Sequence, residues 1–303
     1  MYRIGNGAVA SLVPHPRKTR PAARTASIGR IGKLTLHYVL QGHRTVFGRT
    51  SCQTPWHLLP PIYLDETGSA YTLLVNPSGG LVGGDRLSIE LSVGPKAHVL
   101  ISSPSANRVY RSPSKDSVQE VNLTVGSGGI LEWVPEHTIP FAGSRFRQTI
   151  NAHLADGATL VLWDAVASGR IAHGERWKFT TLENQIRITT ASGASVKEHY
   201  ALAPADSDGG IGLAEDWDYV GSLFIVGDAV DTPLWTSLEA ALTVILENHS
   251  DQVLGGVSQP SVPGMVVKLV ARSAPALTAV LNELWGTVRQ SLWKLPPARL
   301  RKY

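Results

Sequence analysis

The chain has 303 residues, of which 43% are hydrophobic, and a formal net charge of +4 at pH 7. A chain of this length buries roughly three quarters of the surface that its unfolded form exposes, so it needs neither a disulfide nor a metal to fold. Its single cysteine, Cys52, excludes an internal disulfide and a zinc site built from several cysteines.

The first thirty residues carry the excess positive charge and contain no acid; their basic residues are Arg3, Arg17, Lys18, Arg20, Arg24 and Arg30. Prolines interrupt this segment, which has little apolar periodicity. Such composition favours an extended chain, so we predict a flexible basic arm over 1–29 and a folded domain over 30–303. We expect no nucleic-acid partner, because no basic and aromatic platform accompanies the arm.

Alternating apolar residues begin at residue 33 and predict a series of short strands. The expected strands cover 33–40, 70–76, 86–93, 97–102, 118–125, 129–134, 145–154, 159–166, 176–182, 184–190 and 195–202. Turn residues separate most of them, and no helical period interrupts residues 33–200. The pattern indicates a mainly β body of stacked sheets over about 30–205 and argues against a doubly wound sheet.

The last third combines strands with helical patterns and predicts an α+β end over about 218–295. Strands are expected at 221–227 and 264–272, and helices at 232–250 and 273–293. Thr232 and Ser273 are candidate helix caps. The expected buried stripes are Leu234, Leu238, Ala241, Leu242 and Ile245 in the first helix, and Leu277, Val280, Leu281, Leu284, Val288 and Leu292 in the second.

Two glycine pairs, Gly79-Gly80 and Gly83-Gly84, precede Asp85 in the stretch NPSGGLVGGDR. A phosphate loop requires a following helix, but a strand pattern follows here, and a Lys-Ser/Thr pair is absent. Glycine permits positive φ and close backbone approach, so we predict a shaped connection between two strands. This interpretation leaves Asp85 free to cap backbone amides or to face a polar cavity.

Further acids fall within or near strand patterns: Asp164 follows the apolar run TLVLW, where we expect a strand end, and Glu198 lies in SVKEHYAL. Each acid taken alone is more typical of a satisfied or exposed carboxylate. Histidines are scattered without an HxH or HExxH motif, so no tight metal site is predicted. No nucleophile motif occurs either.

Four stretches together resemble one family. They are 76–87, 106–112, 131–147 and 162–177, which read NPSGGLVGGDRL, ANRVYRS, LEWVPEHTIPFAGSRFR and LWDAVASGRIAHGERW. In this order they resemble the urease accessory protein UreD, also called UreH, over roughly residues 30–295. The resemblance implies a mainly β fold of stacked, superhelical sheets with two C-terminal helices, and a protein that is not an enzyme.

The resemblance also implies a role in the maturation of nickel urease. Members of this family act as scaffolds that bind the urease apoprotein and the helical protein UreF, which recruits the GTPase UreG. An internal polar passage is thought to carry nickel to urease. We therefore expect transient Ni²⁺ and no tightly bound cofactor. The resemblance also allows a dimer of the accessory complex.

By motif, Asp85, Asp164 and Glu198 match acids that the family places along or near the passage. Asn107, Arg111 and Glu175 are weaker candidates for its lining or loops. The sequence departs from the family pattern at two places in this polar lining. Asn107-Arg108 stands where the family often has Ser-Lys or Thr-Lys, and Glu198-His199 stands where it often has Glu-Arg.

Two other functions stay open from the residues alone. A β-rich hydrolase could use a pair of these carboxylates, and sugar turnover by the purified chain would favour it. An acid-lined metal store would retain nickel stoichiometrically. No run of about 18 apolar residues predicts a membrane span, and no secretory signal begins the chain, so we expect a cytoplasmic protein without a membrane partner.

Overall fold

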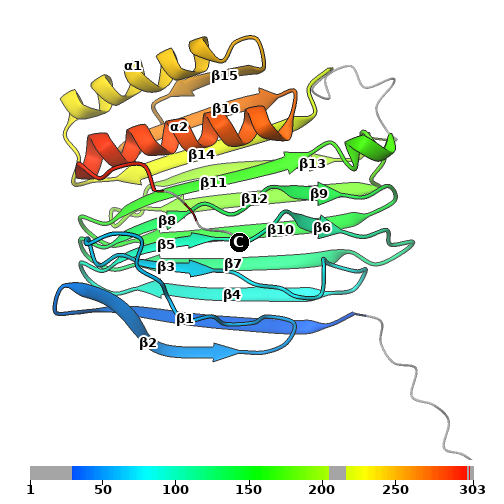
Figure 1. Cartoon of the computed structure of the whole chain (residues 1–303), viewed down its shortest axis with the longest axis horizontal. Coiled ribbons are helices and arrows are strands. Elements are labelled where there is room, and N and C mark those ends of the chain that lie inside the picture. The colour runs from blue at the N-terminus through cyan, green and yellow to red at the C-terminus, as the bar shows by residue number, and fades with distance from the viewer. Residues whose placement is uncertain (1–28, 205–215, 299, 301–303) are drawn as a thin grey trace, which may run out of the picture.

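Two stacked β-sheets form most of the computed structural model, which describes residues 29–204, 216–298 and 300 (Figure 1). The expected mainly β fold with two C-terminal helices is confirmed. The expected arm over 1–29 lies outside the described residues except for Gly29. Its flexibility and the domain boundaries stay predictions.

The seven-stranded sheet has the order β13-β12-β10-β7-β4-β1-β2. Its central strands β1, β4, β7, β10 and β12 run parallel, whereas β2 and β13 pair antiparallel at the two edges. The bounds are β1 Ile31–Gln41, β2 Arg44–Cys52, β4 Arg86–Val93, β7 Ser117–Val125, β10 Arg145–Leu154, β12 Thr181–Thr189 and β13 Ser195–Leu202.

The nine-stranded sheet has the order β15-β16-β14-β11-β8-β5-β3, with β9 paired to β11 and β6 paired to β9. Here β3, β5, β8 and β11 are parallel, and β14, β16 and β15 continue antiparallel. The bounds are β3 Ala70–Leu73, β5 His98–Ser102, β6 Asn107–Val109, β8 Ile130–Trp133, β9 Thr138–Pro140, β11 Thr159–Ala167, β14 Tyr219–Gly227, β15 Val253–Ser258 and β16 Gly264–Ala271.

The main core lies between the two sheets, because side chains of one face of each strand meet there. In β1 and β4 the alternation puts Leu36 and Ile89 inside, and Val99 and Leu162 meet them from the nine-stranded sheet. The chain passes repeatedly between the two sheets, so each parallel strand lies beside the next one of its own sheet (Figure 1).

A second core lies between the nine-stranded sheet and the helices α1, Thr232–Asn248, and α2, Ala274–Trp293. Ser273 caps α2 by accepting the Ala276 N–H, as expected. Thr232 is not the cap of α1: the Asp231 carboxylate accepts the Leu234 N–H at 3.1 Å, and an acid there also suits the helix dipole. Leu234, which was expected in the buried stripe of α1, is only half-buried, whereas the next residue, Trp235, is buried.

A buried cluster of charges ties α2 to the sheet. The carboxylate of Glu132, on β8, is fully buried and accepts hydrogen bonds from His98 Nε2 at 2.6 Å and from Trp285 Nε1 at 2.5 Å. It also forms an ion pair with Arg289, which is 1% exposed. Burial by itself would raise the pKa of Glu132, but His98 and Arg289 lower it overall.

Two expected strands merge in the structure, and β2, β6, β9 and β15 lie outside the expected ranges. The patterns at 176–182 and 184–190 belong to a single strand, β12, which begins only at Thr181. Residue Trp177 has φ of 50°, which an extended chain does not adopt, so the alternation of residues 176–180 belongs to a loop. A short 3₁₀ helix, Ile171–His173, precedes this loop.

Candidate functional site

A layer of polar side chains crosses the otherwise apolar core between the two sheets. Gln148 lies on β10 between the buried Phe146 and Ile150, in the inward phase of the strand. Its register partner on β12 is Asn184, which is also inward and buried. We name this set the polar layer; its members are Gln119, Gln148, Asp164, Asn184, Glu198, Tyr200, Ser222 and Lys268.

Asp164 is the acid at the centre of the polar layer. It lies within β11 of the opposite sheet, not at a strand end, and is 8% exposed. Its two oxygens accept hydrogen bonds from Gln148 Nε2 at 2.8 Å and from Asn184 Nδ2 at 2.9 Å. Burial raises the pKa of Asp164, although these amides and the charge of Lys268 act in the opposite direction.

Hydrogen bonds extend the layer along the seven-stranded sheet. Gln119 Nε2 donates to Gln148 Oε1 at 3.1 Å, and Asn184 Nδ2 lies 3.2 Å from the hydroxyl of Tyr200. Burial raises the pKa of Tyr200, so this hydroxyl stays protonated at neutral pH. The layer therefore runs continuously from β7 to β13, with Asp164 facing its middle.

The end of the layer at β13 carries an ion pair. Asp164, Ser222 and Lys268 are register partners on β11, β14 and β16. Ser222 Oγ donates to Glu198 Oε1 at 3.0 Å and accepts from Lys268 Nζ at 2.9 Å, while Lys268 also pairs directly with Glu198. Burial lowers the pKa of Lys268 to about 8, against the charge of Asp164. A groove opens here toward solvent.

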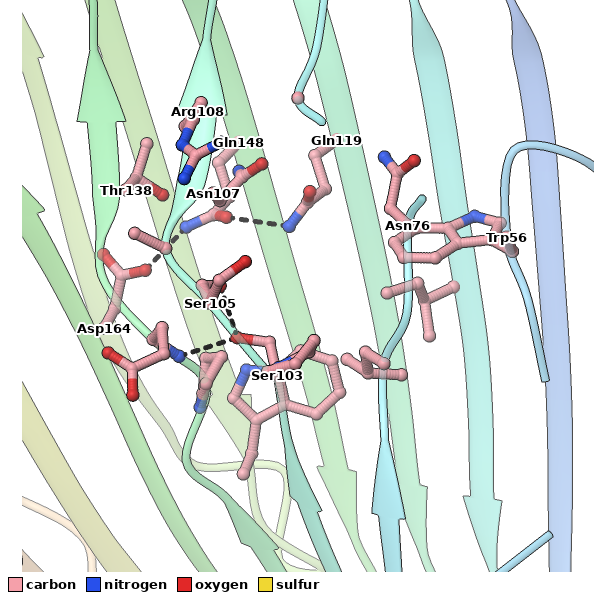
Figure 2. Close-up of a pocket in the computed structure, with 18 of the residues that line it drawn as sticks. Trp56, Asn76, Ser103, Ser105, Asn107, Arg108, Gln119, Thr138, Gln148 and Asp164 are labelled. Carbon is pink, nitrogen blue, oxygen red and sulfur yellow. Dashed lines mark hydrogen bonds between the residues drawn. The ribbon is translucent and has the colours of Figure 1, made fainter. Parts of the chain in front are cut away.

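A cavity of about 120 Å³ lies at the opposite end of the layer, lined by Gln119, Gln148 and Asp164 together with loops 76–80 and 103–108 (Figure 2). Three buried N–H groups of its lining have no protein partner among the described residues: Asn107 Nδ2, Trp56 Nε1 and Trp133 Nε1. Buried donors of this kind are usually satisfied by water, so the cavity suits water or a hydrated ion.

Asp85 has a different environment from Asp164. It is 1% exposed, and its carboxylate accepts the backbone N–H groups of Arg30 at 2.7 Å and Val82 at 3.0 Å. The Arg30 guanidinium pairs with it at 3.0 Å. It does not line the cavity described above. This geometry suits an acid that holds the start of β1 against the glycine loop.

We expect Asp85→Asn to lower the free energy of unfolding by about 1–2 kcal/mol, because an amide replaces a carboxylate that accepts several hydrogen bonds. The contribution of Arg30 is small, since its side chain is 41% exposed and screened by solvent. Urea denaturation measures the change, with the exposed Asp156→Asn as control. Unchanged stability would contradict a structural role and favour the passage role expected from the sequence.

The glycines lie between β3 and β4, as expected, and shape two sides of this loop. Gly80 has φ of 152°, and a Cβ there would lie 2.5 Å from the Arg108 carbonyl oxygen. Gly79 and Gly80 line the cavity. A Cβ at Gly83 would lie 2.0 Å from Ser112 Oγ, and Gly84 has φ of 91°. The second pair therefore positions the segment that ends in Asp85.

The three weaker candidates separate in the structure. Asn107, on β6, lines the cavity. Arg111 forms an isolated bridge with Ser144 away from that lining. Glu175 pairs with Arg170 and accepts the Ala142 N–H at 3.1 Å; these contacts, led by the Arg170 hydrogen bond, lower its pKa to about 2. Glu175 thus braces a loop.

Most of the polar layer was missed by sequence reasoning, although a signal for it exists. Gln119, Gln148 and Asn184 all occupy the phase of a strand whose neighbours are buried. A polar residue in an inward phase is costly unless it finds a partner, so several such positions in successive strands indicate a shared polar network. Strand alternation alone did not show which residues face one another.

Comparison with known proteins decides the family. The family model described as UreD urease accessory protein matches residues 30–302. The chain belongs to the UreD family of urease accessory proteins. It is 29% identical to the "Urease accessory protein UreD" of Haloarcula marismortui, covering 97% of this chain and 100% of that relative. The corresponding protein of Deinococcus radiodurans is 32% identical, covering 90% of this chain and 95% of that relative.

Family membership connects the chain with urease maturation, and its relatives are named as accessory proteins. Within the described part of the chain, no helix is long and apolar enough to span a membrane. The same residues contain no cluster of three or more His, Cys, Asp or Glu that could hold a metal ion.

Proposed function

We propose that the chain is a scaffold for urease maturation that binds the urease apoprotein and UreF, with UreG recruited through UreF, and that passes Ni²⁺ through the polar layer. The observation that supports this most is the continuity of the layer. It connects the cavity at β7 with the open groove at β13 through the centre of the core.

The chemistry of the layer suits transfer better than storage. Its polar groups include carboxylates, amides and hydroxyls that are hydrogen-bonded to one another. A hydrated divalent cation exchanges such oxygen ligands readily, whereas a cage of histidines and cysteines would hold nickel tightly. Asp164 faces the cavity and could accept the ion there, with Glu198 as the next carboxylate along the path.

A hydrolase is the weaker alternative, because none of the three acids is free to act as a nucleophile or a base. Asp85 is paired with Arg30, Asp164 is held by two amides, and Glu198 is paired with Lys268. Retaining and inverting glycosidases need one acid and one base that both reach a substrate from an open cleft.

The test is Asp164→Asn in a strain that co-expresses urease and all accessory proteins. We expect the complex with UreF and urease apoprotein to assemble normally, while the nickel content of urease falls at least about fivefold. Removing a unit charge near a divalent cation removes more than about 1 kcal/mol of attraction. Asp156→Asn, exposed in the turn after β10, is the matched control.

Unchanged nickel content in Asp164→Asn would refute transfer through the polar layer. Loss of the complex together with nickel would identify Asp164 as a folding residue. Excess nickel and bicarbonate given to the resulting apo-urease provide a further control. Partial recovery of activity is expected there, because the defect lies in delivery and not in the enzyme.

A further inference from the structure

The open end of the polar layer is occupied by a cation of the chain itself. Lys268, from β16, directs its ammonium to Glu198 of β13 and Ser222 of β14, and this ammonium lies 5.2 Å from the centre of the Phe224 ring. Lys268 is the only cationic member of the polar layer. The other ionisable groups in this layer are the acids Asp164 and Glu198 and the hydroxyl of Tyr200.

The position of Lys268 has two electrostatic consequences. Its charge neutralises Glu198, whose side chain is 9% exposed, so this acid presents no net charge to an approaching ion. A divalent cation near Glu198 or Asp164 would also be repelled by the ammonium, because like charges at this distance disfavour each other. The ion pair thus closes this end of the layer to Ni²⁺.

The ion pair can be opened without unfolding. Half of the Lys268 side chain is exposed, at 52%, and its long stem lets the ammonium move into water. The backbone of β16 stays fixed between β14 and β15. An arginine would hold the carboxylate with a planar fork, whereas a lysine makes a single-point contact that rotates away more readily.

We propose that Lys268 and Glu198 form a lock at the β13 end of the polar layer, and that displacement of the Lys268 ammonium admits a divalent cation to the Glu198 carboxylate. This inference rests on the proposed transfer function and adds its regulation. The lock keeps the scaffold from binding free metal at this end, and the exposed stem of Lys268 is the part that a docked partner can reach.

The lock is tested by Ni²⁺ binding to the purified full-length chain, measured by equilibrium dialysis. We expect Lys268→Met to bind Ni²⁺ at the Glu198 carboxylate at least tenfold more tightly than the wild type does. Lys268→Arg should bind Ni²⁺ with the affinity of the wild type. Lys268→Gln retains a donor for Glu198 without the charge and serves if the methionine variant does not fold. Lys197→Met, exposed on β13, is the matched control.

The double variant Lys268→Met/Glu198→Gln should not show the increased affinity for Ni²⁺, because the carboxylate that binds the ion is gone. Equal affinity for Ni²⁺ in the wild type and in Lys268→Met, or in Lys268→Gln if the methionine variant does not fold, would overturn the lock. A gain in affinity that survives in the double variant would also overturn it. Nickel delivery to urease in Asp164→Asn tests the transfer function separately from the lock. If delivery falls in Asp164→Asn but Lys268→Gln binds Ni²⁺ no more tightly than the wild type, the lock alone is refuted. Normal delivery in Asp164→Asn refutes transfer.

Discussion

Arg289→Met is expected to lower the free energy of unfolding by about 3–5 kcal/mol, because it leaves the Glu132 carboxylate buried without its cationic partner. Glu132 is fully buried on β8, and Arg289 reaches it from α2. The hydrogen bonds from His98 and Trp285 remain, but the charge of the guanidinium is lost. Urea denaturation at pH 7 measures the loss.

The pH dependence of this loss identifies its cause. In the folded wild type the pKa of Glu132 is lowered relative to the unfolded chain. The ionised carboxylate therefore contributes to the free energy of unfolding at pH values above the unfolded pKa, and this contribution is lost as pH falls through the folded pKa. In Arg289→Met the carboxylate protonates more easily. The difference in free energy of unfolding between the wild type and Arg289→Met should therefore become smaller below about pH 4, near the unfolded pKa of glutamate.

The exposed Arg272 provides the control for this prediction. It lies over the Trp217 ring at 4.4 Å, and Arg272→Met should cost less than about 1 kcal/mol. A gap between Arg289→Met and the wild type that stays constant down to pH 3 would show that lost packing, and not an unpaired charge, destabilises the variant.

Leu281→Asp is expected to remove several kcal/mol of stability and to prevent accumulation of soluble folded chain, because it places a charge without a partner in the second core. Leu281 is 4% exposed on the face of α2 that packs on the nine-stranded sheet. Soluble yield and far-ultraviolet circular dichroism measure the effect.

Val244→Asp is the matched control on the neighbouring helix. Val244 is 52% exposed on α1, so its replacement should leave yield and stability nearly unchanged. A soluble and normally folded Leu281→Asp would mean that α2 leaves the sheet easily. Its apolar stripe would then be available to a partner protein.

The sequence predicts the local elements well, because each depends on near neighbours. The alternation of Leu34, Leu36 and Tyr38 indicates β1, and the helical stripe with Ser273 as cap indicates α2. The misplaced cap at Thr232 is an error of one residue, since Asp231 and Thr232 are both good capping types. Such boundaries depend on backbone geometry that composition does not determine.

The candidate site depends on contacts that are distant in the sequence and could be predicted only in part. Motif resemblance pointed to Asp164, Glu198 and Asp85 alike, although the first two belong to the polar layer and Asp85 pairs with Arg30. The distinction follows from which strands face each other across the core. Lys268 matched no expected motif, because its role comes from a register with Ser222 that long-range strand pairing creates.

The parallel stacking of β1, β4, β7, β10 and β12 has a consequence for synthesis on the ribosome. Each of these strands pairs with the preceding one in the chain's order, so the stack can grow from its N-terminal end while the remainder is still being translated. The last strands to emerge are β14, β15 and β16. They bring Ser222 and Lys268, and a nascent chain therefore has Asp164 in place before the ion pair that closes the layer exists.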